Sequence, residues 1–335
     1  MTKKFKEEIT RREFLKNAAL VGGAVGLSGG LVGMPSLAHA KKKEVTFGTA
    51  SPVGGYMLLA TGIAKCVNDR LPEYNVTPVP EPRASLGNIK AIDSKERELG
   101  LAIANMIYDG YMGNKPFKHK QAIASWFAAH FAIWNVIALE SSGIKTMSDL
   151  KGKRVVVGNP RSSMEIMNRN LLLKAHGLSY NDFKPEMVYL KEAVNLMKDK
   201  HVDALSIIAA PPLAAISELT MSRKVRFISP DKAAMASIIK QAPFFYEYPF
   251  SKSFYPNMIM PDVMPVLAIN HVVVCGSYLP EQMMYDFTKA VFEQIDVIQN
   301  IRKDYKIISL QRAAKGLPIP IHPGAKRYFK EKGVL

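Results

Sequence analysis

The stretch EVTFGTASPVGGYMLLATGIAKCVND, residues 44–69, predicts the fold of this chain. Its first seven residues alternate and are rich in β-forming side chains, a pattern typical of a strand. The glycine pair Gly54-Gly55 follows, and apolar residues then recur at helical spacing from Tyr56 to Asp69. A strand, a glycine turn and a helix therefore stand in succession.

The same order of elements continues along the chain. Residues 76–104 predict a strand, a helix and a short buried strand, which completes a β-α-β-α-β series. Such a series favours a parallel sheet with helices on both faces. A second parallel sheet is predicted within residues 153–228, and long apolar strands precede it at 132–139 and follow it at 266–275.

The two long strands suggest how the parts are connected. If the last helix packs on the first unit, the chain crosses between two α/β lobes twice, and the two crossing strands make a hinge. We expect lobe I at 41–135 and 270–335 and lobe II at 136–269. A cleft between hinged lobes is a common place for a ligand.

Residues 1–40 have the three parts of an export signal. A basic head ends at Arg11-Arg12, a glycine-rich apolar body extends to about Leu37, and small residues end the segment at Ala38-His39-Ala40. The head resembles a twin-arginine signal. Cleavage after Ala40 and a periplasmic location are expected. The alternative is an uncleaved N-terminal anchor, which also places residue 41 onward outside the cytoplasm.

The chain is basic, with a net charge of +16 from 45 Lys and Arg and 29 Asp and Glu. The leader holds six of the basic and three of the acidic residues, so the charge after cleavage is +13. A surplus of this kind attracts anions. Because the basic residues are scattered, without a run of five or more, nucleic-acid binding is not expected.

The cysteine and histidine patterns point to no metal or cofactor. The histidines are dispersed, and no Cys-x-x-Cys is present. Cys66 and Cys275 lie in a predicted helix face and a predicted strand, which favours two small buried residues over a disulfide, although an exported protein could form one.

Four loops share one position, at the carboxyl end of a strand and the start of a helix. Helix N-termini leave N–H groups unpaired and carry partial positive charge, so they suit anions. The alternative is that the serines only cap their helices. The loops are Ser51-Pro52-Val53-Gly54-Gly55-Tyr56, Arg83-Ala84-Ser85-Leu86-Gly87-Asn88, Arg161-Ser162-Ser163-Met164 and Ala209-Ala210-Pro211-Pro212-Leu213.

No catalytic constellation stands out. A dinucleotide fingerprint, a phosphate loop and a Gly-x-Ser-x-Gly elbow are all missing from the sequence. Asp109, Glu140 and Glu165 near predicted strand ends are expected to be solvated or to cap helices. Binding is therefore favoured over chemistry, and the chain is not expected to be an enzyme.

At these loops and in two longer segments the chain resembles the TAXI-type solute-binding proteins of TRAP transporters. Residues 46–65 and Ala84-Ser85 with Asn88 look like the first two loops of that family. Residues 143–155 (GIKTMSDLKGKRV) and 316–325 (GLPIPIHPGA) are similar to two of its longer and more specific segments. The resemblance extends over nearly all of residues 44–333.

The resemblance implies a two-lobed, type II periplasmic-binding-protein fold. It implies capture of a small organic anion, often a carboxylate such as glutamate or 2-oxoglutarate, for delivery to the membrane subunits of an ion-driven transporter. A monomer without cofactor is expected. The residues that match the family's ligand loops are Ser51, Gly54, Gly55, Tyr56, Ser85, Asn88, Ser162 and Ser163.

This chain also departs from the family's pattern. Arg161 and Met164 stand where the family has glycine and threonine, and Asn105 stands in place of a common glutamine. In the fourth loop, Ala210 replaces glycine and Leu213 replaces asparagine. We expect Arg161 to bind a carboxylate, with Met164 and Leu213 as an apolar wall, so that the ligand has a more apolar body than glutamate. The alternative is that Arg161 points into solvent.

Three other functions remain open at this stage. They are a binding protein of another importer class, a sensory receptor, and an exported α/β enzyme. The fold alone does not separate the first two from a TRAP protein.

Overall fold

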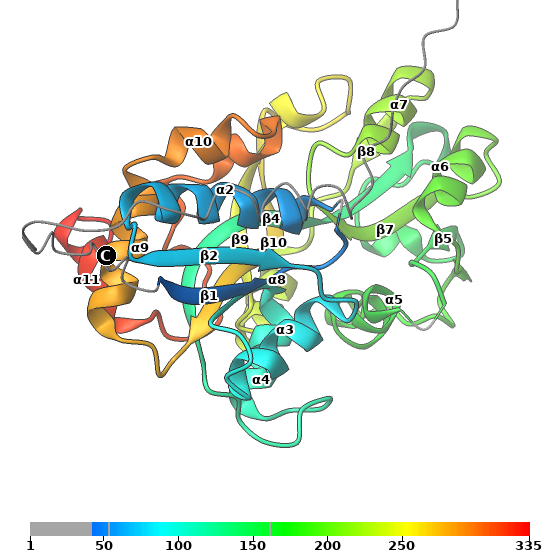
Figure 1. The fold of residues 1–335 in the computed structure, drawn as a ribbon. Helices are drawn as coiled ribbons and strands as arrows, with labels where there is room; N and C mark the ends of the chain where they lie inside the picture. The colour runs from blue at the N-terminus through cyan, green and yellow to red at the C-terminus, as the bar shows by residue number, and fades with distance from the viewer. Residues whose placement is uncertain (1–41, 53, 161) are drawn as a thin grey trace, which may run out of the picture. The chain divides into compact units, whose positions relative to one another are not determined.

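The computed structural model describes residues 42–52, 54–160 and 162–335, without the side chain of Ser163, and the predicted leader lies outside these ranges. Strands and helices alternate along the chain (Figure 1). The strands are β1 Lys43–Gly48, β2 Tyr74–Val79, β3 Leu99–Ile103, β4 Ile123–Leu139, β5 Arg154–Val156, β6 Lys184–Glu186, β7 Ala204–Ala209, β8 Val225–Phe227, β9 Phe245–Ser251 and β10 Val263–Gly276. The α-helices are α2 Gly55–Arg70, α3 Ala84–Asp93, α4 Ala104–Met112, α5 Ser163–Met167, α6 Leu190–Lys198, α7 Ala214–Ser222, α8 Lys232–Gln241, α9 Glu281–Phe292, α10 Ile295–Gln299 and α11 Pro323–Glu331.

The predicted β-α-β-α-β series is confirmed. β1, β2 and β3 are parallel and lie in the order β2-β1-β3. Figure 1 shows α2 and α3 on opposite sides of these strands, and they bury Leu59 and Ile89 in separate apolar clusters. The carboxyl end of β1 therefore lies beside the starts of both helices.

β4 and β10 are the two longest strands, with 17 and 14 residues, and they pair with each other antiparallel. β10 pairs with β3 over 271–275 and with β9 over 263–269, while β4 pairs with β7 over 133–138. Each strand thus changes neighbours along its length. Strands covered on both faces need continuous apolar runs, which explains the sequence of β4.

The two predicted sheets are in fact joined. The described strands form one ten-stranded sheet in the order β2-β1-β3-β10-β4-β7-β5-β6, with β8 beside β4 and β9 beside β10. The hydrogen bonds run without a break across β4 and β10, so the expected boundary between sheets does not exist. An apolar pattern predicts a strand but does not say which strands pair.

Separate apolar cores lie in the two parts of the sheet. One core contains Val45, Trp126 and Phe329, so α11 packs with the first strands of the chain. Another contains Trp134 and Val155. A core of its own for each part is what two lobes require.

The region after β5 is not one continuous α-helix. α5 ends at Met167, and a π-helical segment, Asn168–Leu172, follows it. The buried Asn168 side chain donates to the carbonyl oxygens of Val157 (3.0 Å) and Ser206 (2.9 Å). These bonds hold Asn168 against the end of β5 and against β7, and the wider π-helical turns begin at this residue. Further along the chain, β6 lies at Lys184–Glu186 and α6 begins at Leu190.

The two cysteines are buried and free, as the sequence favoured. Within the described residues, no helix is long and apolar enough to span a membrane.

Candidate ligand-binding site

The first two predicted loops meet at a cavity of about 320 Å³. Its lining includes five of the residues that the sequence singled out, namely Ser51, Gly54, Gly55, Tyr56 and Ser85. α2 begins at Gly55 without a side-chain cap, so its first turn presents the N–H groups and partial positive charge typical of a helix N-terminus. The structure therefore brings five of the predicted residues together at one cavity.

Ser85 does not cap α3, because its hydroxyl oxygen accepts a hydrogen bond from the N–H of Ile103 at 3.1 Å. This bond ties the second loop to the end of β3. The Tyr56 hydroxyl lies within 2.5 Å of His271 Nδ1. Burial raises the pKa of Tyr56, and a hydrogen bond with Ser85 opposes that rise only in part. Tyr56 is thus a neutral hydroxyl at the cavity wall.

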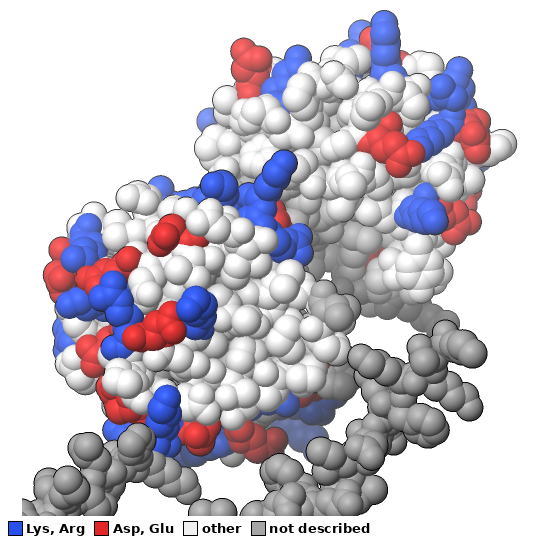
Figure 2. Space-filling model, turned by 45° about the horizontal axis from the view of Figure 1, so that its top comes forward, with Lys and Arg blue, Asp and Glu red and all other residues white. Residues whose placement is uncertain are grey.

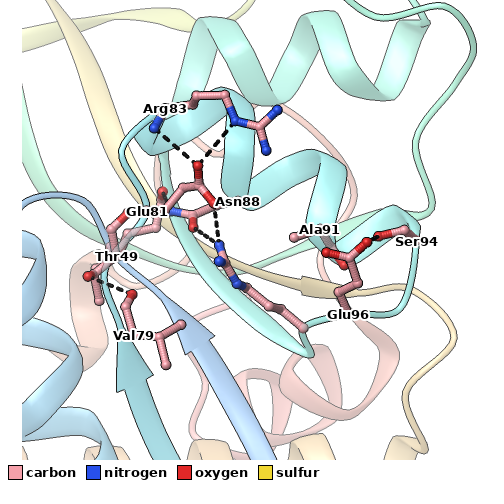
Figure 3. Close-up of polar contacts among 10 residues, drawn as sticks. Thr49, Val79, Glu81, Arg83, Asn88, Ala91, Ser94 and Glu96 are labelled. Carbon is pink, nitrogen blue, oxygen red and sulfur yellow. Dashed lines mark hydrogen bonds and ion pairs between the residues drawn. The ribbon is translucent and has the colours of Figure 1, made fainter.

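Asn88 lies behind the cavity rather than in its lining. It is fully buried, and its amide donates to the carbonyl oxygens of Thr49 (2.7 Å) and Leu101 (2.8 Å). Its Oδ1 accepts from Arg97 at 3.1 Å (Figure 3). In this structure Asn88 holds the first loop against β3, although the sequence predicts that it binds the ligand.

A buried carboxylate completes this support. Glu81 is 5% exposed and pairs with Arg97 at 2.9 Å and Arg83 at 3.3 Å (Figure 3). Burial alone would raise the pKa of Glu81, but the hydrogen bonds from the Arg83 N–H and both guanidinium groups outweigh it, so the pKa is lowered. The charged carboxylate therefore pins the second loop.

A larger cavity of about 660 Å³ lies nearby. Its lining includes two more predicted residues, Ala210 and Leu213, and residues 302–307 of the C-terminal region other than Tyr305. Figure 2 shows that one face of the described part is hollowed, with Lys and Arg side chains along an edge, while basic and acidic side chains are interspersed elsewhere on that face. The cavity volume falls within the range of about 300–1,000 Å³ that is usual for small-molecule sites.

The third loop contributes less than expected. The Ser162 hydroxyl accepts from the N–H of Glu165 at 3.1 Å and so caps α5, which is the alternative noted from the sequence. Met164 Sδ accepts from the N–H of Ile208 at 3.2 Å. Glu165, which was expected to be solvated or capping, is instead buried and paired with Arg169 at 2.9 Å. None of the three lines either cavity.

Three predicted residues remain. Arg161 and the side chain of Ser163 lie outside the described part of the chain. Asn105 lies in the first turn of α4 and lines neither cavity, and its buried Oδ1 has no hydrogen-bond partner among the described residues.

The cap at Ser162 leads to a prediction. Ser162→Ala removes the acceptor for the Glu165 N–H, so we expect the free energy of unfolding to fall by about 1 kcal/mol. Urea denaturation monitored by circular dichroism measures this. Ser162→Asp restores an acceptor and should recover most of the loss. Equal stability of the Ala variant and the wild type would show that the cap contributes nothing.

The sequence analysis missed two stacked histidines between the cavities. His130 lines the larger cavity and His271 the smaller one. Their rings stack with centroids 4.4 Å apart and an angle of 13°. Asn270 pairs with Phe131 and Val272 with Ala128, so Ala129 and His130 of β4 together oppose His271 alone. A bulge of this kind redirects side chains next to functional sites.

Both histidines are held neutral by their surroundings. Burial, and then the positive charge of Arg302, lower the pKa of His130 to about 4. Burial, and then His130, lower the pKa of His271 well below its usual value. Nδ1 of His130 is buried without a hydrogen-bond partner among the described residues. The sequence signal that could have identified His130 is its position as a lone histidine within the largely apolar, 17-residue strand β4.

Known structures share this architecture. The chain is similar to a TctC solute-binding protein from Polaromonas, with 14% identity over 87% of this chain and 98% of that chain and a TM-score of 0.52. It is also similar to the periplasmic aliphatic sulphonate-binding protein SsuA from Escherichia coli, with 17% identity over 86% of this chain and 78% of that chain and a TM-score of 0.46. A third similar structure is PhnD1 from Prochlorococcus marinus in complex with methylphosphonate, with 10% identity over 88% of this chain and 99% of that chain and a TM-score of 0.48.

Sequence identities this low support an inference about the fold alone. That inference rests on the similarity to the TctC protein. With β4 and β10 running through both parts of the sheet, the expected two-lobed, type II periplasmic-binding-protein fold is confirmed.

The family model described as "NMT1-like family" matches residues 47–333. The match begins in β1 and ends after α11, so it includes both cavities. The resemblance to TAXI-type proteins names a more specific group of proteins than this family model does. The chain belongs to the NMT1-like family.

Proposed function

We propose that this protein is an extracytoplasmic solute-binding protein that captures a small organic anion, with a carboxylate as the charged group, and delivers it to a TRAP-type secondary transporter. The observation that carries the proposal is the larger cavity, because both expected lobes contribute to it. Ala210, Leu213 and Phe254 come from lobe II, and Arg302 and Lys306 come from lobe I. Closure of the lobes would surround a ligand held there.

The lobe boundaries at 135/136 and 269/270 belong to this proposal. They are supported by the places where the long strands change neighbours, which are near Ile133 in β4 and between Ile269 and His271 in β10. A ligand drives closure only by the difference between its affinities for the open and closed states. Contacts from both lobes to one ligand provide such a difference.

The proposal is one of binding without turnover. Among the described residues that line the two cavities, Asp304 is the only carboxylate, and both of its oxygens are bonded to Arg302, at 2.9 and 3.0 Å. A second carboxylate, which general acid–base chemistry by paired acids would need, does not line them.

The segment GLPIPIHPGA, residues 316–325, supports the fold more than the ligand. Gly316 has a φ of 64°, and a Cβ there would lie 2.5 Å from the Tyr246 ring. His322 caps α11 by accepting from the N–H of Gly324 at 3.3 Å. The motif thus sets the backbone conformation at Gly316 and the start of α11. Its likeness to TAXI-type proteins therefore supports a shared architecture. The TRAP assignment rests on that resemblance.

Export is part of the proposal as well. The tripartite leader, the twin arginines and the small residues before Lys41 support secretion with cleavage after Ala40. Amino-terminal sequencing of the protein from a periplasmic extract is expected to begin at Lys41. A chain that begins at Met1 in the membrane fraction would support the uncleaved anchor instead.

Two measurements test the function. Mass spectrometry of the native protein is expected to find an organic acid that co-purifies with it, and calorimetry should then give its affinity. Uptake of that acid by spheroplasts should stop when ionophores collapse the ion gradients and should continue when ATP is depleted. The reverse dependence would assign the protein to an ATP-driven importer.

A further inference from the structure

We propose that the two cavities form one site, and that its ligand is an organic acid with a large apolar body whose carboxylate binds at Arg302. This inference rests on the proposed function and names its ligand class. Arg302 is the N-cap residue of a 3₁₀-helical segment, Lys303–Ile307. It lies outside the four loops that the sequence indicated.

A shared wall of aromatic and basic side chains joins the cavities. Tyr56, in the smaller cavity, contacts both histidine rings edge-on, with centroids 5.6 Å from His271 and 6.2 Å from His130. The Tyr305 hydroxyl donates to the carbonyl oxygen of Gly55 at 2.5 Å. A Cβ built on Gly55 would lie 3.3 Å from Nη1 of Arg302. Glycine at position 55 thus lets the guanidinium of one cavity approach the helix start of the other.

Arg302 is fixed in place with one edge still available. Asp304 accepts from its Nε at 2.9 Å and its Nη2 at 3.0 Å, and the guanidinium lies 5.3 Å from the Tyr305 ring centroid. The third guanidinium nitrogen, Nη1, takes no part in these two bonds to Asp304 and faces the start of α2. A guanidinium held in this way can present its other N–H groups to a carboxylate.

The charges around Arg302 favour an anion. Lys303 and Lys306 line the same cavity, against the single carboxylate of Asp304. Nδ1 of His130, which is buried and has no hydrogen-bond partner in the described part of the chain, lies at the same wall. A carboxylate here would gain the basic side chains on one side and the N-terminus of α2 on the other.

The rest of the larger cavity is apolar and rigid. Phe131, Pro211, Pro212, Leu213, Phe254 and Ile307 line it. Phe254 stacks on Phe250 with centroids 5.1 Å apart, and the N–H of Leu213 donates to the Tyr255 hydroxyl at 2.8 Å. These contacts hold Phe254 and Leu213 in place within lobe II. A compact polar acid such as glutamate would leave them uncovered.

The first experiment measures ligand class by calorimetry on the cleaved protein, residues 41–335. The probes are butyrate, octanoate and phenylacetate, with glutamate and 2-oxoglutarate as compact polar acids. Each buried methylene is worth roughly a fourfold gain in affinity. We expect octanoate to bind at least 30-fold more tightly than butyrate, and phenylacetate more tightly than glutamate.

The second experiment tests Arg302. Arg302→Gln is expected to weaken octanoate binding at least tenfold and to leave the weaker binding of octanamide, which carries no charge, within twofold. Asp304→Asn removes the competing carboxylate and should bind octanoate at least as tightly as the wild type. Arg327→Gln, on α11, is the matched control and should change nothing. Thermal unfolding confirms that each variant is folded.

The outcomes separate the inference from the function. If glutamate or 2-oxoglutarate binds more tightly than the apolar acids, or if Arg302→Gln keeps octanoate affinity within twofold, the inference is overturned and organic-anion capture stands. An equal loss for octanoate and octanamide also overturns it, because the role of Arg302 would then be structural. If none of the acids binds the folded wild type, both proposals fail.

Discussion

Asn88→Ala is expected to lower the free energy of unfolding by about 3 kcal/mol. The amide of Asn88 donates to two carbonyl oxygens, Thr49 at 2.7 Å and Leu101 at 2.8 Å, in a fully buried environment. Each buried acceptor left without a donor costs about 1–3 kcal/mol. The substitution also leaves Arg97 with one acceptor fewer, although Glu81 still pairs with it.

The second part of the sheet contains a counterpart that should respond in the same way. Asn168 is fully buried and donates to the carbonyl oxygens of Val157, which follows β5, and Ser206, which lies in β7. Asn88 links β1 and β3 in the same way. Asn168→Ala is therefore expected to destabilise by a similar amount. In both parts of the sheet an asparagine from the helical segment joins the end of one strand to the neighbouring strand, next to a predicted ligand loop.

Urea unfolding with constant m-values measures both losses. Asn114→Ala is the control, since Asn114 is exposed and its side chain bonds only Asp109 among the described residues; we expect a change within about 0.5 kcal/mol. If Asn88→Ala were as mild as the control, Asn88 would not be the support that its contacts suggest. Its predicted role as a ligand residue would then gain weight.

The sequence predicted the elements of the fold for a physical reason. Apolar periodicity reports which face of each segment is buried, and β1, α2 and β3 are local elements that this signal describes fully. The same logic located Ser51, Tyr56 and Ser85 beside one cavity, because carboxyl ends of parallel strands meet at one edge of a sheet. These predictions needed no knowledge of which distant strands pair.

The remaining site residues depend on long-range pairing. His130 and His271 are separated by 141 positions, and they stack only because β4 pairs with β10 with a bulge at that place. Arg302 reaches the start of α2 because the segment after α10 packs there. Asn88 was assigned to the ligand because it matches the second loop of TAXI-type proteins, yet its amide bonds the backbone of Thr49 and Leu101. A local pattern cannot distinguish these outcomes.

Acidification from pH 7 to pH 4 is expected to remove about 3 kcal/mol of stability through His130 alone. The pKa of His130 is about 4 in the folded chain, against 6.5 for an unperturbed histidine. Well above pH 6.5 the ring is neutral in both states and has no effect. As the pH falls from there towards 4, the unfolded chain binds a proton that the folded chain resists, at about 1.4 kcal/mol per pKa unit. His271 shifts in the same direction.

The neighbours of the two rings cannot offset this effect. Arg302 is positive throughout this range, and it acts to lower the pKa of His130. Burial raises the pKa of Tyr305 to about 12 and also raises that of Tyr56, so neither hydroxyl supplies a negative charge at acidic pH. Protonation of one ring would also disfavour protonation of the other, because two positive charges would then be stacked 4.4 Å apart.

Urea unfolding of the wild type and of His130→Phe at pH 7, 6, 5 and 4 measures the effect. Carboxylates elsewhere contribute to acid unfolding in both proteins, so the difference between the two pH slopes isolates His130. We expect the His130→Phe variant, which keeps an aromatic ring against His271, to lose about 3 kcal/mol less than the wild type. His201→Gln, at an exposed position, is the control. Parallel slopes for wild type and His130→Phe would mean that water reaches the stacked pair freely, and the wall between the two cavities would then not be the dry surface against which an apolar acid could pack.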